Sequence, residues 1–208
     1  MTTFAKRCTL PLVMILGLLA GCARLESEPP LATRHLVESA KATVERFSHI
    51  KQLAEFARHI PDAKAIAILP NLVKAGFIAG GEGGDGVLLK RNASGGWTGP
   101  AFFSLGSASL GLQAGIQQTE VILVIYSDAA LQAVLKDQGS IGASTGLTVA
   151  VYGAGISGAT TTNAGADIAA FANSKSGLFA GLSFEGSVFI RRNDLNDAFY
   201  GKGGDYPD

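Results

Sequence analysis

The residues with the most specific chemistry lie near the N-terminus. Lys6 and Arg7 precede an apolar segment of eleven residues, 10–20, which is too short to span a bilayer as a helix. The sequence Leu19-Ala20-Gly21-Cys22 follows and matches a bacterial lipobox, in which small residues admit the signal peptidase and the cysteine thiol accepts a diacylglyceryl chain. The motif predicts a lipoprotein signal peptide at residues 1–21 and an acyl anchor on Cys22; the alternative is an ordinary signal peptide with a chance cysteine. Ala23 follows the cysteine, where an aspartate would favour the inner membrane, so we expect an outer-membrane anchor facing the periplasm or the cell surface.

The other chemical motifs are incomplete. Gly153, Gly155 and Gly158 satisfy G-x-G-x-x-G after an apolar run, but a poor helix-forming segment follows and no acid lies about 20 residues on, as a dinucleotide site needs. Glu82 and Asp85 lie in a glycine-rich run, 80–86, that lacks the Gly-Lys-Ser/Thr of a phosphate-binding loop. Two carboxylates are too few for a calcium site, so a solvated turn is the favoured interpretation of this run.

Catalytic and zinc-binding constellations are also missing from the sequence. The three histidines, His35, His49 and His59, all precede residue 60, and the mature chain has no cysteine besides Cys22. Ser144 lies in Gly142-Ala143-Ser144-Thr145-Gly146, which fits G-x-S-x-G, but no histidine follows it to complete a catalytic triad. We therefore expect a protein that is not an enzyme and has no cofactor and no metal site.

The composition limits the binding partners. The 208 residues include 27 glycines, 47 % are hydrophobic and only 16 % are charged, which is typical of one domain rich in strands and turns. Removing Lys6 and Arg7 with the leader leaves 15 basic residues against 17 acidic ones. This balance argues against nucleic acid as a partner, and binding of an anionic lipid would need a local basic patch.

The chain after the leader begins with a polar tether, residues 22–30, and continues as one domain, residues 31–204. Apolar residues recur at helical spacing from Leu31 to Ile60, with a break near Ser48 and His49, and Pro61 ends the helix. Acids nearly match bases in this segment, so we favour helices that cover a sheet over a membrane-surface helix.

The remaining sequence is typical of strands joined by short turns. We expect strands at residues 65–69, 87–90, 108–117, 120–126, 145–152, 167–173 and 178–190. We expect helices at 128–137, ended by Gly139, and at 193–199, capped by Asn193 or Asp194. The small residues of 139–165 are spaced as in membrane helices, but threonines interrupt them and favour a bent strand. The fold class that these elements predict is α+β, an antiparallel curved sheet or partial barrel with N-terminal helices and short packing helices.

An ordered set of motifs resembles the SYLF family of lipid-binding domains. The set spans roughly residues 36–202 and comprises Ile66-Ala67-Ile68-Leu69-Pro70-Asn71, Lys74-Ala75-Gly76-Phe77, Pro100-Ala101-Phe102-Phe103, the glycine-rich stretch from Asn173 to Ile190, and Asn196-Asp197-Ala198-Phe199-Tyr200. Read without the resemblance, residues 173–190 form a two-strand hairpin of a β-rich core.

The resemblance implies binding of phospholipid, which in eukaryotic members means phosphoinositides. Actin binding belongs to eukaryotic members, and we do not expect it of this protein without an actin partner. We therefore expect an envelope lipoprotein whose domain binds membrane phospholipid, a phosphoinositide-like or other anionic lipid; its protein partner is unknown. The alternative is a structural lipoprotein whose only membrane contact is its acyl anchor.

Anionic headgroups need several cations on one surface. The candidates lie at expected strand ends and in the signature stretch, and each is otherwise an ordinary solvated charge: Lys64, Lys74, Lys90, Arg91, Lys175, Arg191 and Arg192.

Overall fold

A computed structural model describes residues 28–51, 53–76, 79–110, 115–136, 139–141, 145–154, 165–176, 184 and 186–204. The expected signal peptide, Cys22 and most of the tether lie outside these residues. The helices are α2 (Pro29–His49), α3 (Phe56–His59), α4 (Asp128–Leu135) and α5 (Asn193–Tyr200). The strands are β1 (Ala65–Gly76), β2 (Ala79–Arg91), β3 (Trp97–Leu110), β4 (Gly115–Ile125), β5 (Gly139–Ile141), β6 (Val149–Ala154), β7 (Ile168–Ser176) and β8 (Ser187–Arg191).

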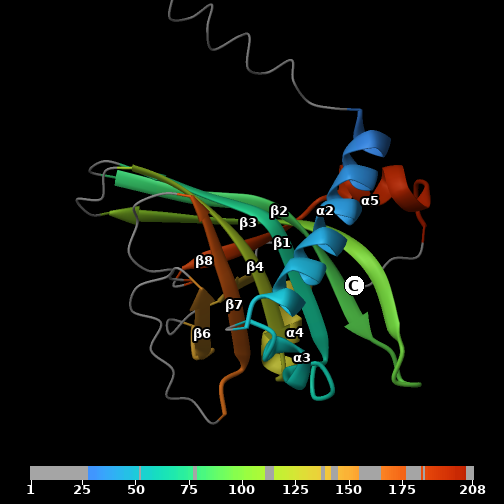
Figure 1. Cartoon of the computed structure of the whole chain (residues 1–208). Helices are drawn as coiled ribbons and strands as arrows, with labels where there is room; N and C mark the ends of the chain where they lie inside the picture. Colours follow the sequence, from blue (N-terminus) through green and yellow to red (C-terminus); the bar gives the residue numbers. More distant parts are fainter. Residues whose placement is uncertain are drawn as a thin grey trace, which may run out of the picture.

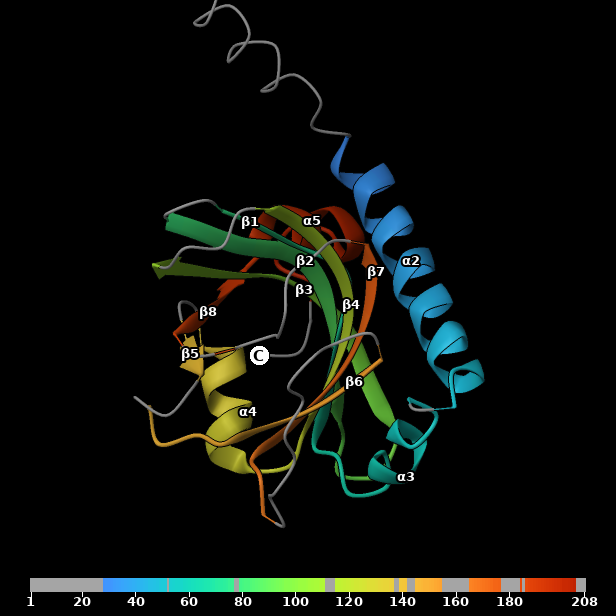
Figure 2. The same ribbon diagram turned by 60° about the vertical axis from the view of Figure 1, so that its left-hand side comes forward.

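The strands form one curled sheet in the order β5-β8-β3-β2-β1-β4-β7-β6 (Figure 1). Long central strands curve around a concave face, so that the sheet is a half-barrel (Figure 2). The expected α+β fold with a curved sheet is confirmed. Its antiparallel character holds for every described pair except β6 and β7, which run parallel.

Both faces of the sheet are buried. On the concave face, alternate residues such as Leu69, Leu123 and Phe189 pack with α4 into one hydrophobic cluster. On the convex face, the intervening residues, such as Ile68 and Ile122, form a second cluster with α2, α3 and α5. Burial on both faces explains the nearly continuous apolar run of β4, where every residue from Thr119 to Ile125 is buried.

The N-terminal helices cover the convex face as expected. Ala40 and Phe47 of α2 and Phe56 of α3 are buried against the sheet, so the apolar side of α2 is not available as a membrane-surface face. The expected break near Ser48 is confirmed, because α2 ends at His49. The helix starts at Pro29, two residues earlier than expected, since proline is favoured in the first turn, where its missing N–H has no helical partner.

Strand β1 is longer than the expected strand at 65–69. It passes through Pro70 to Gly76 with a shift of register against both neighbours between Ile68 and Val73. Because this bulge places one extra residue in β1, the ladder resumes beyond Pro70, where we had expected it to end.

The glycine-rich run 80–86 is part of β2, so its interpretation as a solvated turn is wrong. A Cβ on Gly84 would lie 2.4 Å from the carbonyl oxygen of Asn71, in the bulge of β1. A Cβ on Gly86 would lie 2.7 Å from the carbonyl oxygen of Ile68. Glycine is needed here because the bulged backbone approaches β2 closely.

Other boundaries differ locally. Residues 108–117, expected as one strand, contain the end of β3 and the start of β4, and β6 begins at Val149. Gly139 begins β5 and does not end a helix, since α4 stops at Leu135. Helix α5 has Arg192 at its N-cap without a side-chain capping bond, so neither Asn193 nor Asp194 is the cap. Of the stretch expected as a strand at 178–190, β8 supplies residues 187–190, and residues 177–183 and 185 lie outside the described part.

No helix among the described residues is long and apolar enough to cross a bilayer.

Candidate functional site

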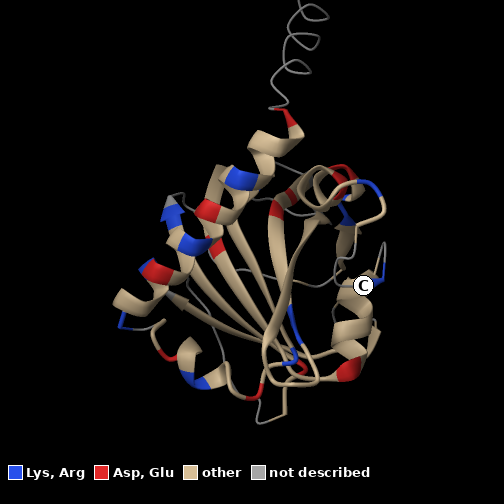
Figure 3. Cartoon of the chain, turned by 90° about the vertical axis from the view of Figure 1, so that its right-hand side faces the viewer, with Lys and Arg blue, Asp and Glu red and all other residues tan. Residues whose placement is uncertain are grey.

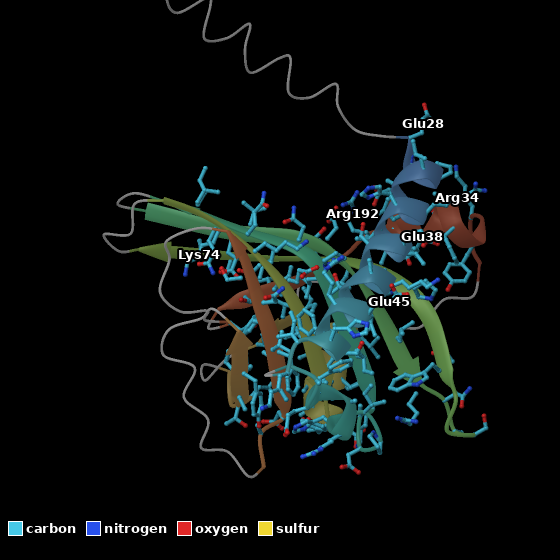
Figure 4. The ribbon with its side chains drawn as sticks, viewed as in Figure 1. Glu28, Arg34, Glu38, Glu45, Lys74 and Arg192 are labelled. Carbon is cyan, nitrogen blue, oxygen red and sulfur yellow. The ribbon has the colours of Figure 1, made fainter. Side chains whose placement is uncertain are left out.

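The predicted headgroup cations lie in three separate places. Lys64, Lys90 and Arg91 are close together where β1 begins and β2 ends, since Ala65 pairs with Lys90. Lys74 and Lys175 lie toward the opposite ends of their strands, and Arg191 and Arg192 end β8. Figure 4 shows Lys74 at the projecting ends of the long strands, far from Arg192 beneath α2.

We call the first group, together with Trp97, the tryptophan end. The guanidinium carbon of Arg91 lies 4.3 Å from the centre of the Trp97 ring, and Trp97 is 37 % exposed. Arg91 also donates to the carbonyl oxygens of Ala63 at 2.7 Å, Ile60 at 2.6 Å and Gly95 at 2.8 Å. These bonds fix the arginine beside an exposed aromatic ring. Their acceptors are backbone carbonyls, and none of the described hydrogen bonds of Arg91 goes to a carboxylate.

Lys64 adds a second cation to the tryptophan end. Its ammonium lies 2.5 Å from Asp128, and both side chains are well exposed, so this pair contributes little to stability. Lys90 precedes Arg91 in β2 and pairs with Ala65, so its side chain points to the opposite face of the sheet from Arg91 and Trp97. The tryptophan end therefore combines cations with an aromatic side chain at the surface.

Arg191 and Arg192 do not form one patch, because successive residues of a strand point to opposite faces. Arg191 donates to the carbonyl oxygen of Leu135 at 2.8 Å, at the C-terminal end of α4. Arg192 is held on the other face by Asp85 at 2.9 Å and Asp194 at 2.7 Å.

A cavity of about 780 Å³ adjoins Arg192 at the start of α2. It is lined by Glu28, Pro29, Leu31, Ala32, His35, Leu36, Asp85, Arg192, Asp194 and Leu195. Its acids outnumber its one arginine, so the cavity does not attract an anionic headgroup by charge. Basic and acidic residues also alternate along α2 (Figure 3).

Lys175 belongs to a buried polar cluster that the sequence did not reveal. The cluster surrounds Glu120 of β4, whose side chain is fully buried between the sheet and α2. Oε1 of Glu120 accepts hydrogen bonds from Thr43 at 2.9 Å and from Arg46, and it lies 3.2 Å from the ammonium of Lys175. Oε2 accepts a 3.0 Å bond from Asn173. Burial alone would raise the pKa of Glu120, but these donors outweigh burial and lower it.

Lys74 lies on the concave face, opposite Glu82 in the neighbouring strand. Glu82 is 8 % exposed, and among the described residues its Oε1 has no hydrogen-bond partner. Burial raises the pKa of Glu82 to about 7, although the charge of Lys74 partly opposes this. Asp85 lies on the convex face with Arg192, so Glu82 and Asp85 cannot hold one cation between them.

A second, smaller cavity of about 380 Å³ lies beside the start of β1. Its lining includes His59, Tyr126 and Tyr152, and a 2.6 Å hydrogen bond joins the hydroxyl of Tyr126 to Nδ1 of His59. Burial raises the pKa of Tyr126 to about 12, and electrostatic interactions with Tyr152 and Asp62 add to this. The sequence analysis missed this cavity, because its residues come from four separate segments.

The described residues contain no group of three or more histidine, cysteine, aspartate or glutamate side chains placed to hold a metal ion.

Comparisons with known proteins identify the family. Residues 106–206 match the Ysc84 family model, described as "Las17-binding protein actin regulator". The bovine SH3 domain-containing YSC84-like protein 1 is 34 % identical over 146 residues, which cover 69 % of this chain and 42 % of the relative. The chain belongs to the Ysc84 (SYLF) family.

Yeast relatives match this chain over a similar length. LAS seventeen-binding protein 3 of Saccharomyces cerevisiae is 35 % identical over 142 residues, or 67 % of this chain and 30 % of the relative. Protein YSC84 of the same yeast is 34 % identical over 142 residues. This SYLF chain thus spans less than half the length of these curated relatives.

Proposed function

We propose that this SYLF protein is a non-enzymatic envelope lipoprotein, anchored in the outer membrane through acylated Cys22, whose domain binds phospholipid at the tryptophan end. The observation that carries the lipid-binding part is Trp97, exposed and stacked under Arg91, with Lys64 beside Arg91. Tryptophan favours the boundary between acyl chains and headgroups, and nearby cations attract anionic headgroups at about 1 kcal/mol each.

The start of α2 and the tryptophan end lie far apart in the structure. The chain enters α2 at Pro29, and Arg91 bonds to Ile60, beyond the last turn of α3. A helix of 21 residues is roughly 30 Å long. Under the proposal, the domain either lies along its own membrane or meets a second bilayer with its far end. Binding must therefore be measured without the acyl chain.

The test is sedimentation of residues 28–208 with vesicles of phosphatidylglycerol and phosphatidylcholine. We expect binding that rises with the phosphatidylglycerol content and falls with salt. Lys64→Glu with Trp97→Ala should weaken it at least about ten-fold, the effect of losing two contacts of this size. Lys41→Glu, an equal charge change on the exposed side of α2, is the matched control and should bind as the parent does.

The alternative function, a structural lipoprotein with only its acyl anchor in the membrane, is favoured by a different observation. Several of the predicted cations are engaged inside the protein: Lys175 by Glu120, and Arg192 by Asp85 and Asp194. Absence of vesicle binding at low salt by a folded 28–208 fragment would select this alternative.

The anchor has its own test. Cys22→Ser should leave the precursor unprocessed and without an acyl chain, as shown by its gel mobility and by labelling with a radioactive fatty acid. A processed, acylated protein in this variant would remove the lipobox from the proposal.

A further inference from the structure

The smaller cavity combines aromatic rings with a carboxylate. Its full lining is His59, Asp62, Tyr126, Ala150, Tyr152, Gly165, Ala166 and Ala169. The lining residues that are not aromatic or acidic are glycine and alanine, so the space of about 380 Å³ exists because no large side chain fills it. The described lining contains no lysine or arginine, and its one carboxylate is that of Asp62.

The three rings are held at angles to one another. The ring of His59 lies 6.1 Å from that of Tyr126, tilted by 46°, and 5.7 Å from that of Tyr152, tilted by 53°. The hydrogen bond between Tyr126 and His59 fixes the first pair. Stacking on Phe171, at 4.7 Å and 9°, fixes the ring of Tyr152. The rings are thus set before any ligand binds, which lowers the entropy cost of binding.

We propose that this cavity binds the ammonium group of a choline- or ethanolamine-type compound, with the aromatic rings as the cage and Asp62 as the counter-charge. Tilted rings around a cavity are the arrangement that recognises quaternary ammonium groups, because each ring turns its negative face toward the cation. The proposal deepens the proposed function and rests on it for the source of the ligand, a zwitterionic phospholipid headgroup.

The position of the cavity fits a headgroup. Asp62 and Lys64 are two residues apart at the start of β1, and Lys64 belongs to the tryptophan end. The backbone N–H of Lys64 donates to Ile125, and Tyr126 follows directly in the chain. An ammonium in the cavity thus leaves the phosphate of the same headgroup within reach of a lysine, as a zwitterion requires.

The first experiment titrates the full chain, purified in a non-ionic detergent, with phosphocholine, tetramethylammonium and the neutral isostere 3,3-dimethylbutanol, followed by calorimetry. We expect saturable binding of both cations and at least about three-fold weaker binding of the isostere, the size of one exposed cation–π contact. No saturable binding of the cations, or equal binding of the isostere, overturns the proposal.

Variants distinguish a loss of the aromatic cage from a loss of the fold. Asp62→Asn, at an exposed position, should weaken phosphocholine binding about three-fold or more, whereas Glu38→Gln, at an exposed position of α2 outside the cavity, should not. Tyr126→Phe removes the bond to His59 but keeps the ring, so binding should persist. Tyr152→Leu removes a ring and should weaken binding. Unchanged affinity in both Asp62→Asn and Tyr152→Leu contradicts the cage.

Vesicles distinguish the sources of the ammonium. If Asp62→Asn weakens sedimentation with phosphatidylcholine vesicles but not with phosphatidylglycerol vesicles, the ligand is a lipid headgroup. If it weakens only the binding of free phosphocholine, the site takes a soluble ammonium compound. If the proposed function is wrong, the protein will not bind vesicles through the tryptophan end. That result does not depend on whether free phosphocholine binds in the cavity.

Discussion

Glu120 and Glu82 are two buried glutamates of one sheet with opposite surroundings. Glu120 lies on the convex face, where Thr43, Arg46, Asn173 and Lys175 surround its carboxylate. Glu82 lies on the concave face, and among the described residues its Oε1 has no partner. The pKa of Glu120 is lowered, whereas burial raises that of Glu82 to about 7.

The difference shows that burial alone does not decide the charge of a carboxyl group. Burial disfavours the ionised form at both sites, and only the donors around Glu120 reverse its effect. The convex face therefore uses an ionised glutamate to join α2, β4 and β7. The concave face contains a glutamate that is partly protonated near neutral pH.

The largest expected effect comes from Glu120→Ala. The change leaves Arg46, Lys175 and Asn173 without their shared acceptor, so we expect the free energy of unfolding to fall by about 3–5 kcal/mol, as for the breaking of other buried ion pairs. Arg46 and Lys175 are partly exposed and can regain water, which favours the lower end of this range. Urea unfolding followed by circular dichroism measures the change.

One further variant and a lower limit calibrate that result. Lys175→Ala removes one of several donors and should cost less than half as much as Glu120→Ala. A loss below about 1 kcal/mol in Glu120→Ala would mean that the cluster adds no net stability, as happens for some buried ion pairs.

The second prediction concerns the pH dependence that Glu82 adds. Its pKa in the folded protein, about 7, exceeds the ordinary value of 4.5, so the folded state retains a proton that the unfolded state loses. This stability is fully present below about pH 4.5 and is lost as the pH rises through about 7. The total loss is on the order of 3 kcal/mol at most.

Glu82→Gln should flatten this decline between about pH 4.5 and 7, because glutamine does not titrate. The slope is the quantity to compare, since a buried amide changes the absolute stability by its own hydrogen bonding. Glu120 has the opposite sign: its contribution is present above the unfolded pKa and is lost in acid. Glu120→Gln should therefore keep the decline toward pH 7, and an equal flattening in both variants would refute the comparison.

The sequence predicted the fold where one physical signal dominated. Helical spacing located α2 and α3, and the Val/Ile-rich run located β4. Prediction from the sequence failed at Pro70 and in the glycine run 80–86, because the bulge of β1 and the glycines that accommodate it lie on different strands. Local propensity cannot reveal a close approach between two segments that are distant in the sequence.

The candidate site was less predictable. The sequence named Lys90 and Arg91 as strand-end cations but gave no reason to place Trp97 beneath Arg91. The cluster at Glu120 did leave a signal, an acid at the start of an apolar central strand, which requires buried partners. Its partners, in α2 and β7, could not be found without the register of β4 with β7.

The smallest expected effect comes from Lys74→Gln. Lys74 faces Glu82 across the β1–β2 ladder, and its positive charge favours the ionised carboxylate. Removing that charge should raise the pKa of Glu82 further, so the decline of stability should extend to higher pH and its midpoint should move upward by a fraction of a pH unit. Lys90→Gln, on the same pair of strands but at the other end, is the control and should leave the midpoint unchanged. Because Lys74 is half-exposed, salt screens its charge, and the difference between parent and Lys74→Gln should shrink in 1 M salt, where the Debye length is about 3 Å. A downward shift of the midpoint in Lys74→Gln would show that Lys74 does not act on Glu82 through its charge.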